Sequence, residues 1–264
     1  MYIRDIHADG TISMLRQLIL NNPLGILTTG IRSTVYPFLQ SSHIPFVLDV
    51  VDPSSETELG TLRGHLARSN PQSKAIIEAL RTNQASSSAN ILEEEVLVLF
   101  TCSAHHYVTP KFYTETKPKS GKVVPTWNYA AAQAYGKAKI HWDHKSAESC
   151  EFLMKQMHDL SEHAESSIMG YTGQGNASKP WSIHDAPEKY IELLRTNIIG
   201  IEIKIDRLEG KFKMSQEMPL GDRHGVVDGL ADLGSEIGMK VSEIVRERSA
   251  NKETKQQAIK KRQE

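Results

Sequence analysis

The segment GHLARSNP (64–71) combines side chains that could hold an anion. Alternating residues predict a strand that ends near Arg68 and Ser69, and Asn70 followed by proline is typical of a helix start. Free backbone N–H groups and the positive end of the helix dipole would then face the same corner. Arg68 could bind a phosphate through two parallel hydrogen bonds. The alternative is that Asn70 only caps the helix while Arg68 lies in solvent, and the spacing favours neither.

The stretch VVPTWNY (123–129) places two aromatic residues around Asn128 near a proline. Valine, threonine and aromatic residues favour a strand, whereas a proline removes one backbone donor. A strand end with an aromatic face and an amide would suit a flat polar ligand. An ordinary strand leaving a barrel edge is the simpler explanation.

A third segment, KFKMSQ (211–216), lies near a predicted strand end. Alternation puts Lys211, Lys213 and Ser215 on one face, with Gln216 on the other. Such a face could contact a polar ligand, but the pattern alone favours a solvated amphipathic strand.

The eleven histidines show no recognised arrangement of metal ligands. His141 and His144, with Asp143 between them, could bind a metal, but surface or hydrogen-bonding roles are the more economical interpretation. The common phosphate-loop, dinucleotide, hydrolase-elbow and zinc-protease motifs are missing. The sequence therefore assigns no metal ligand and no catalytic residue.

The chain that must position these segments contains both predicted strands and predicted helices. Short connections between strands favour an α+β domain built on an antiparallel barrel or sheet, rather than a doubly wound parallel fold. In the segment 198–216, isoleucines at every second position predict a half-buried strand, and Glu209-Gly210 predicts the turn into a second one. Further strands are expected at 24–29, 36–50, 61–68 and 94–110, helices at 9–21, 71–81, 146–165, 185–195 and 222–233, and polar loops at 82–90 and 114–122.

The composition excludes several classes of protein. With 31 basic and 32 acidic residues, the chain has no global charge that would draw it to nucleic acid. Two cysteines make no disulfide framework and indicate a reducing compartment. We expect neither a secretory signal nor a membrane span. The polar tail from Lys240 to Glu264 carries eight basic and four acidic residues, a balance of +4 that could touch DNA, although a solvated helix is the simpler interpretation.

Taken together, the chain resembles the PaiB-type FMN-binding negative transcriptional regulators. The resemblance runs from about residue 1 to 230 and depends on several motifs found in one order: NNPLGILTT, SSHIPFVLD, GHLARSNPQ, VVPTWNY, PWSIHDAPEKYI and GIEI followed by GKFKMSQ. It implies an antiparallel FMN-binding split β-barrel with flanking helices, similar to pyridoxamine-phosphate oxidases, over 1–235, and a polar helical or disordered tail over 236–264. It also implies a homodimer with FMN at the subunit interface.

Motif positions matching the family imply a set of cofactor-binding residues. These are His43, His65, Arg68, Ser69, Thr126, Trp127, Asn128, Lys211, Ser215 and Gln216. One departure is Glu217, where the family often has asparagine, because a carboxylate would repel a phosphate.

The resemblance leaves three functions open. The first is a flavin-binding negative transcriptional regulator, although no helix-turn-helix motif is evident. The second is an FMN-dependent oxidoreductase acting on a small molecule, with a general acid–base drawn from His43, His65 or Tyr129. A barrel that stores flavin without turnover is a third, plainer reading. We expect a cytoplasmic protein, or a nuclear one if it is a eukaryotic regulator.

Overall fold

The computed structural model describes residues 1–82 and 90–263, which form two compact units. The barrel unit comprises Thr11–Phe100 and Gln133–Leu208. The second, here called the hairpin unit, comprises Met1–Gly10, Thr101–Ala132 and Glu209–Glu264. Most of the polar loop expected at 82–90 lies outside the described residues.

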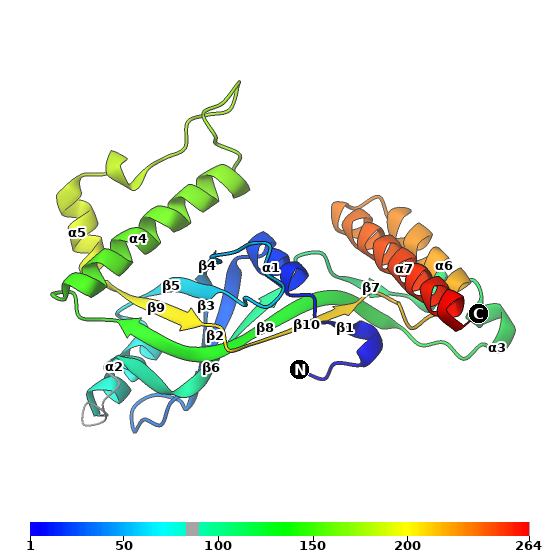
Figure 1. Ribbon diagram of the computed structural model, residues 1–264, viewed down its shortest axis with the longest axis horizontal. Coiled ribbons are helices and arrows are strands. Elements are labelled where there is room, and N and C mark those ends of the chain that lie inside the picture. Colours follow the sequence, from blue (N-terminus) through cyan, green and yellow to red (C-terminus); the bar gives the residue numbers. More distant parts are fainter. Residues whose placement is uncertain (83–89, 264) are drawn as a thin grey trace. The chain divides into compact units, whose positions relative to one another are not determined.

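The strands of the barrel unit form one antiparallel sheet. Their order is β3-β2-β6-β8-β9-β5-β4, and the two strands at the ends of this path are separated in the chain only by Phe46. The chain itself therefore joins the two ends of the path, so that the sheet curves back on itself as a barrel. The bounds are β2 (Leu24–Gly30), β3 (Leu39–Pro45), β4 (Val47–Asp49), β5 (Thr61–Ala67), β6 (Ile91–Thr101), β8 (Thr126–His141) and β9 (Ile198–Lys204) (Figure 1).

The alternation predicted for β9 fixes its inner face. Ile199, Ile201 and Ile203 are completely buried, and β9 pairs antiparallel with both β5 and β8. Phe46 and Phe100 add an edge-to-face ring pair at 5.9 Å between centroids. The predicted α+β fold with an antiparallel barrel and flanking helices is confirmed.

Helices flank the barrel. Helix α2 starts as predicted, because the backbone N–H of Gln72 donates to Asn70 Oδ1 at 2.8 Å and Pro71 occupies the first helical position. Helix α4 packs on β9 through Phe152, whose ring stacks on His141 at 3.8 Å, while His141 Nε2 lies 2.8 Å from a Glu202 oxygen. The helices are α1 (Ile12–Asn21), α2 (Pro71–Thr82), α4 (Ala147–His163) and α5 (Glu188–Thr196).

The hairpin unit contains two antiparallel helices at the end of the chain. Helices α6 and α7 pack along each other (Figure 1), with Val226 and Leu230 of α6 and Val241 and Val245 of α7 buried. The tail is thus helical, and the first part of α7 is part of a core. The remaining elements of this unit are β1 (Ala8–Asp9), β7 (His106–Val108), α3 (Thr116–Ser120), β10 (Arg207–Lys213), α6 (Leu220–Ala231) and α7 (Glu236–Gln263), with the first half of β8.

Two local predictions are wrong. The turn between the last two strands lies at 205–206, and Glu209-Gly210 falls inside β10, where Gly210 pairs with Asp9 of β1. Glycine inside a strand marks close backbone approach as often as a turn. The loop expected at 114–122 contains the short helix α3, which ends at Gly121 in the left-handed conformation. Among the described helices, none combines the length and apolar character needed to cross a bilayer.

Candidate functional site

The predicted phosphate-binding arginine lies at the corner where β5 leads into α2. Arg68 Nε donates to the carbonyl oxygen of Thr196 at 3.2 Å, and Nη2 donates to the carbonyl oxygen of Trp142. The arginine is therefore anchored to the backbone on one side. Its Nη1 makes no hydrogen bond to any described residue, so this nitrogen is available to a ligand.

A pocket of about 540 Å³ opens at this corner, and positive charges dominate its lining. Arg68, Lys74 and Arg81 contribute three cations, Glu78 contributes one carboxylate, and Tyr36 contributes an aromatic ring. Burial lowers the pKa of Arg68 below its ordinary value, and the nearby charge of Arg81 lowers it further. Repulsion among these cations is relieved when an anion enters the pocket.

Lys74 and Arg81 were not among the residues predicted for the site. They lie seven positions apart on α2, which places them on the same face of the helix two turns apart. This spacing was present in the sequence. The spacing indicates an anion site only once Arg68 is known to line the same pocket. On its own, a charged helix face is typical of a face exposed to solvent.

The other predicted residues of the barrel unit differ in their surroundings. His65 is half-buried, and its buried Nδ1 has no hydrogen-bond partner among the described residues. Burial lowers the pKa of His65, which favours the neutral imidazole. His43 is exposed on β3, and Ser69 is exposed before the first turn of α2.

In the hairpin unit, three predicted residues form a buried polar cluster. Asn128 Nδ2 lies 3.0 Å from Ser215 Oγ, and both side chains are completely buried. Gln216 Nε2 donates to the carbonyl oxygen of Phe212 at 2.6 Å, while its Oε1 accepts from the backbone N–H of Met214 at 2.6 Å. Asn128 and Ser215 thus pair with each other, while Gln216 pairs with the backbone on either side of Lys213. Ser215 has a left-handed φ of 62°.

The lysine that joins this cluster is Lys213 rather than Lys211. Lys213 Nζ donates to Thr126 Oγ1 and, at 3.0 Å, to the carbonyl oxygen of Trp127. Burial lowers the pKa of Lys213. Lys211 instead donates to the carbonyl oxygen of Tyr2 at 3.1 Å and lies 5.3 Å from the ring centre of Tyr129.

Trp127 lies near the start of β8 and is exposed. Its side chain is about half exposed, and its Nε1 donates to His105 Nδ1 at 3.2 Å. The Tyr107 ring lies edge-on at 6.2 Å between centroids. The aromatic residue predicted to face a ligand therefore belongs to an exposed aromatic group.

Glu217, the departure from the family pattern, has a partner. Its carboxylate lies 2.9 Å from Nε2 of His7, which is almost completely buried. Burial acts to raise the pKa of Glu217, but the hydrogen bond from His7 and other interactions outweigh burial, so the pKa is lowered. The carboxylate is thus held ionised by a protein partner.

The residues fit an FMN phosphate best at the β5–α2 corner. The pocket beside Arg68 offers three cationic side chains and a free Nη1, which suits a phosphate dianion. The orphaned Nδ1 of His65 lies on the strand that leads to this corner and is a further polar atom without a protein partner. By contrast, the predicted residues Asn128, Ser215 and Gln216 are buried and already paired.

Comparison with known proteins identifies the family of the chain. The family model described as "Putative FMN-binding domain" matches residues 1–207. An uncharacterised protein of Emericella nidulans is 58% identical, over 97% of this chain and the whole of that protein. The Bacillus subtilis protein named "Protease synthase and sporulation protein PAI 2" is 24% identical over 71% of this chain and 72% of its own length.

The solved structures include more distant matches. The FAD and heme binding protein from Mycobacterium smegmatis aligns with a TM-score of 0.43 and 13% identity, covering 78% of this chain and 73% of that one. The family match spans well over half of the chain and includes the β5–α2 corner. The chain therefore belongs to this FMN-binding domain family.

Proposed function

We propose that the protein binds the FMN phosphate in the pocket at the β5–α2 corner. The observation that carries the proposal is the meeting of Arg68, Lys74 and Arg81 around one opening along α2. Hydrogen bonds between cationic donors and phosphate oxygens are short and strong. Arg68 would orient the phosphate, because its side chain is anchored to two backbone carbonyls, while Lys74 and Arg81 would neutralise charge.

We further propose that the bound flavin serves as the redox group of an oxidoreductase that acts on a small molecule. FMN supplies two-electron chemistry when it is bound, and the protein supplies orientation and proton transfer. His65 suits proton transfer best among the residues considered, because burial keeps its imidazole neutral and Nδ1 lacks a protein partner.

Three cations of α7 are already engaged in contacts within the protein. Lys240 pairs with Glu236 at 2.6 Å, Arg248 pairs with Asp9, and Lys252 donates to the carbonyl oxygen of Gln216 at 2.8 Å. Side chains held in this way have to break protein contacts before they reach a phosphate of DNA. They are therefore poorly suited to form a DNA-binding surface.

The enzyme proposal is tested by mixing the FMN-loaded protein with NADH or NADPH. Because the substrate is unidentified, oxygen and a quinone serve as electron acceptors. We expect nicotinamide oxidation faster than that by the same concentration of free FMN. His65→Gln should lower this rate while the flavin stays bound to the protein, and His144→Gln, at an exposed position outside the FMN motifs, provides the matched comparison. A rate no higher than that of free FMN would contradict the proposal.

A negative transcriptional regulator is the second candidate. It is favoured by the similarity to the Bacillus protein, whose name refers to protease synthase and sporulation rather than to a substrate. The regulator predicts binding to DNA from its own promoter with an affinity that falls steeply as salt rises. Binding of equal strength to unrelated DNA, or none at low salt, would argue against a regulator that binds DNA directly.

We also propose a homodimer with FMN at the subunit interface, as the family resemblance implies. Light scattering should give twice the chain mass of 29.5 kDa for the FMN-loaded protein. A monomer that retains stoichiometric flavin would exclude an interfacial site. This measurement is independent of the redox assay.

A further inference from the structure

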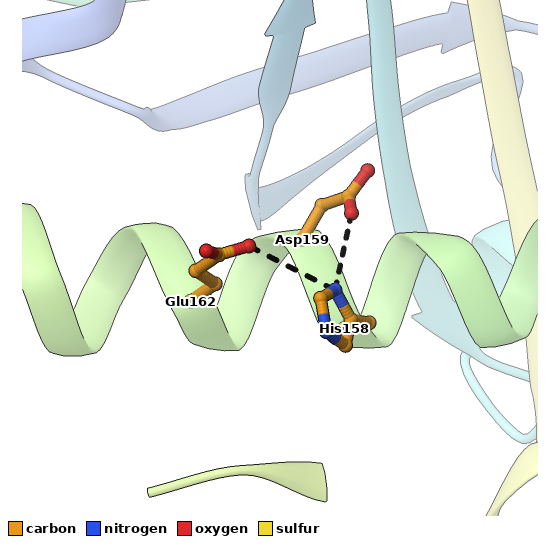
Figure 2. A group of neighbouring side chains, drawn as sticks. All are labelled: His158, Asp159 and Glu162. Atoms are coloured by element: carbon orange, nitrogen blue, oxygen red, sulfur yellow. Dashed lines mark hydrogen bonds and ion pairs between the residues drawn. The ribbon is translucent and has the colours of Figure 1, made fainter. Parts of the chain in front are cut away.

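Helix α4 carries three metal-ligating side chains on one turn. The imidazole of His158 faces the carboxylates of Asp159 and Glu162, as Figure 2 shows. His158 Nδ1 lies 3.3 Å from Asp159 Oδ1 and 3.9 Å from Glu162 Oε2, and the three ligand atoms lie within 4.8 Å of one another. In a tetrahedral zinc site with bonds of about 2.0–2.2 Å, ligand atoms lie about 3.3–3.6 Å apart. Small side-chain rotations bring this group to that spacing.

A fourth donor comes from a different part of the chain. His184 belongs to the 3-10 turn Ile183–Asp185, and its ring centre lies 6.3 Å from that of His158. Buried Ile183 and a capping box between Ser182 and Asp185 fix this turn in place. Two imidazoles bound to one tetrahedral ion have ring centres about 5–5.5 Å apart, so binding of a shared ion requires the His184 ring to move about 1 Å toward His158 and to turn one nitrogen to the ion.

In the described part of the chain, the cations near these four residues contact only one oxygen of Asp159, which leaves its other oxygen and the Glu162 carboxylate available to a metal ion. Asp159 Oδ2 accepts from Arg63 Nη2 at 2.6 Å and from Lys155 Nζ at 2.5 Å, whereas Oδ1 faces His158. The two cations therefore occupy the far oxygen of this carboxylate and hold its orientation. Glu162 is mostly exposed and has no competing ion pair with a lysine or arginine among the described residues, so the site has an entry path from solvent.

We propose that His158, Asp159, Glu162 and His184 form a binding site for a divalent transition-metal ion of the zinc class. Imidazole nitrogens favour zinc, copper, nickel or cobalt over magnesium and calcium, which prefer sites made of oxygen ligands. Bound metal would link α4 to the 3-10 turn that carries His184. The loop between these elements would then be closed by the metal as well as by packing.

The test uses the untagged full-length protein after treatment with a chelator. Titration with Zn²⁺ in competition with a chromophoric chelator should show one bound ion per chain, and Co²⁺ should give the strong visible absorption of a tetrahedral site. His158→Ala and Glu162→Gln should each weaken zinc binding at least about tenfold, since loss of even an outer-shell partner commonly has that effect. His184→Ala should weaken zinc binding and reduce the cobalt absorption.

Matched controls lie on the same helix. His163→Ala and Glu151→Gln remove an imidazole and a carboxylate elsewhere on α4 and should leave zinc affinity unchanged. Circular dichroism checks that each variant keeps its helix content. Failure of the wild type to bind zinc, or equal binding by wild type, His158→Ala and Glu162→Gln, would overturn the site. Unchanged affinity and spectrum in His184→Ala would overturn the assignment of the fourth ligand.

Discussion

Arg63 and Asp159 form an ion pair of 2.6 Å that ties strand β5 to helix α4. Arg63 also pairs with Asp49 of β4 and donates to Gln156 of α4 at 3.3 Å. The guanidinium is almost completely buried, and these partners offset the cost of removing its charge from water. Burial acts to raise the pKa of Asp159, but hydrogen bonds from Lys155 and Arg63 outweigh it and lower the pKa.

Replacing this arginine should destabilise the barrel unit. Arg63→Met leaves Asp49 and Asp159 without their shared partner, and breaking a buried pair of this kind costs about 3 kcal/mol of unfolding free energy. Chemical denaturation of both proteins measures the difference. The matched control is Lys139→Met, which removes a more exposed ion pair between β8 and α4. It should cost less than about 1 kcal/mol. Equal losses of unfolding free energy in the two variants would show that the buried ion pairs of Arg63 stabilise the fold no more than an exposed pair does.

A glycine at a close approach of two strands gives a second prediction. A Cβ at Gly136 in β8 would overlap the backbone carbonyl oxygen of Lys204 in β9. Backbone cannot move aside as a flexible side chain does, so Gly136→Ala should lower the unfolding free energy by about 2 kcal/mol. Gly10→Ala is the control, because nothing lies within 4 Å of its added Cβ. A stable Gly136→Ala protein would mean that the two strands are not so close.

The residue patterns predicted an α+β fold with an antiparallel barrel or sheet, and the family resemblance narrowed this to a barrel. The isoleucines of β9 and the Asn70-Pro71 helix start each depend on neighbours in the chain, and both predictions are confirmed. The burial of Arg63 could not be predicted in this way. Its partners Asp49 and Asp159 lie 14 and 96 residues away, and only the folded barrel brings them together.

The candidate site shows the same limit. Arg68 could be identified because it adjoins a recognisable helix start, but the pocket also needs Arg81, which lies at the other end of α2. Lys213 was placed on the same face as Lys211, and the choice between them depends on pairing with Thr126 on another strand. The role of every predicted residue in FMN binding remains a prediction.

The hairpin unit should respond to acid through Glu217. Because the pKa of Glu217 is lowered in the folded protein, its carboxylate stabilises the fold above the ordinary value of 4.5. This contribution is lost as the pH falls from 4.5 through the lower folded pKa. Denaturation at a series of pH values should therefore show a steeper acid loss for the wild type than for Glu217→Gln. Parallel pH profiles would contradict the lowered pKa.

The phosphate pocket is tested most directly by comparing FMN with riboflavin, which lacks the phosphate. Flavin fluorescence titrations should show that the wild type binds FMN at least about tenfold more tightly than riboflavin, because each hydrogen bond to a charged group contributes about 1.5–3 kcal/mol. Lys74→Gln with Arg81→Gln should remove most of this preference while riboflavin affinity stays the same. Arg68 is left intact, since it also holds the backbone. Lys189→Gln, on exposed α5, should behave as wild type. Equal affinity of the wild type for both flavins, or a full FMN preference in the double variant, would contradict the account.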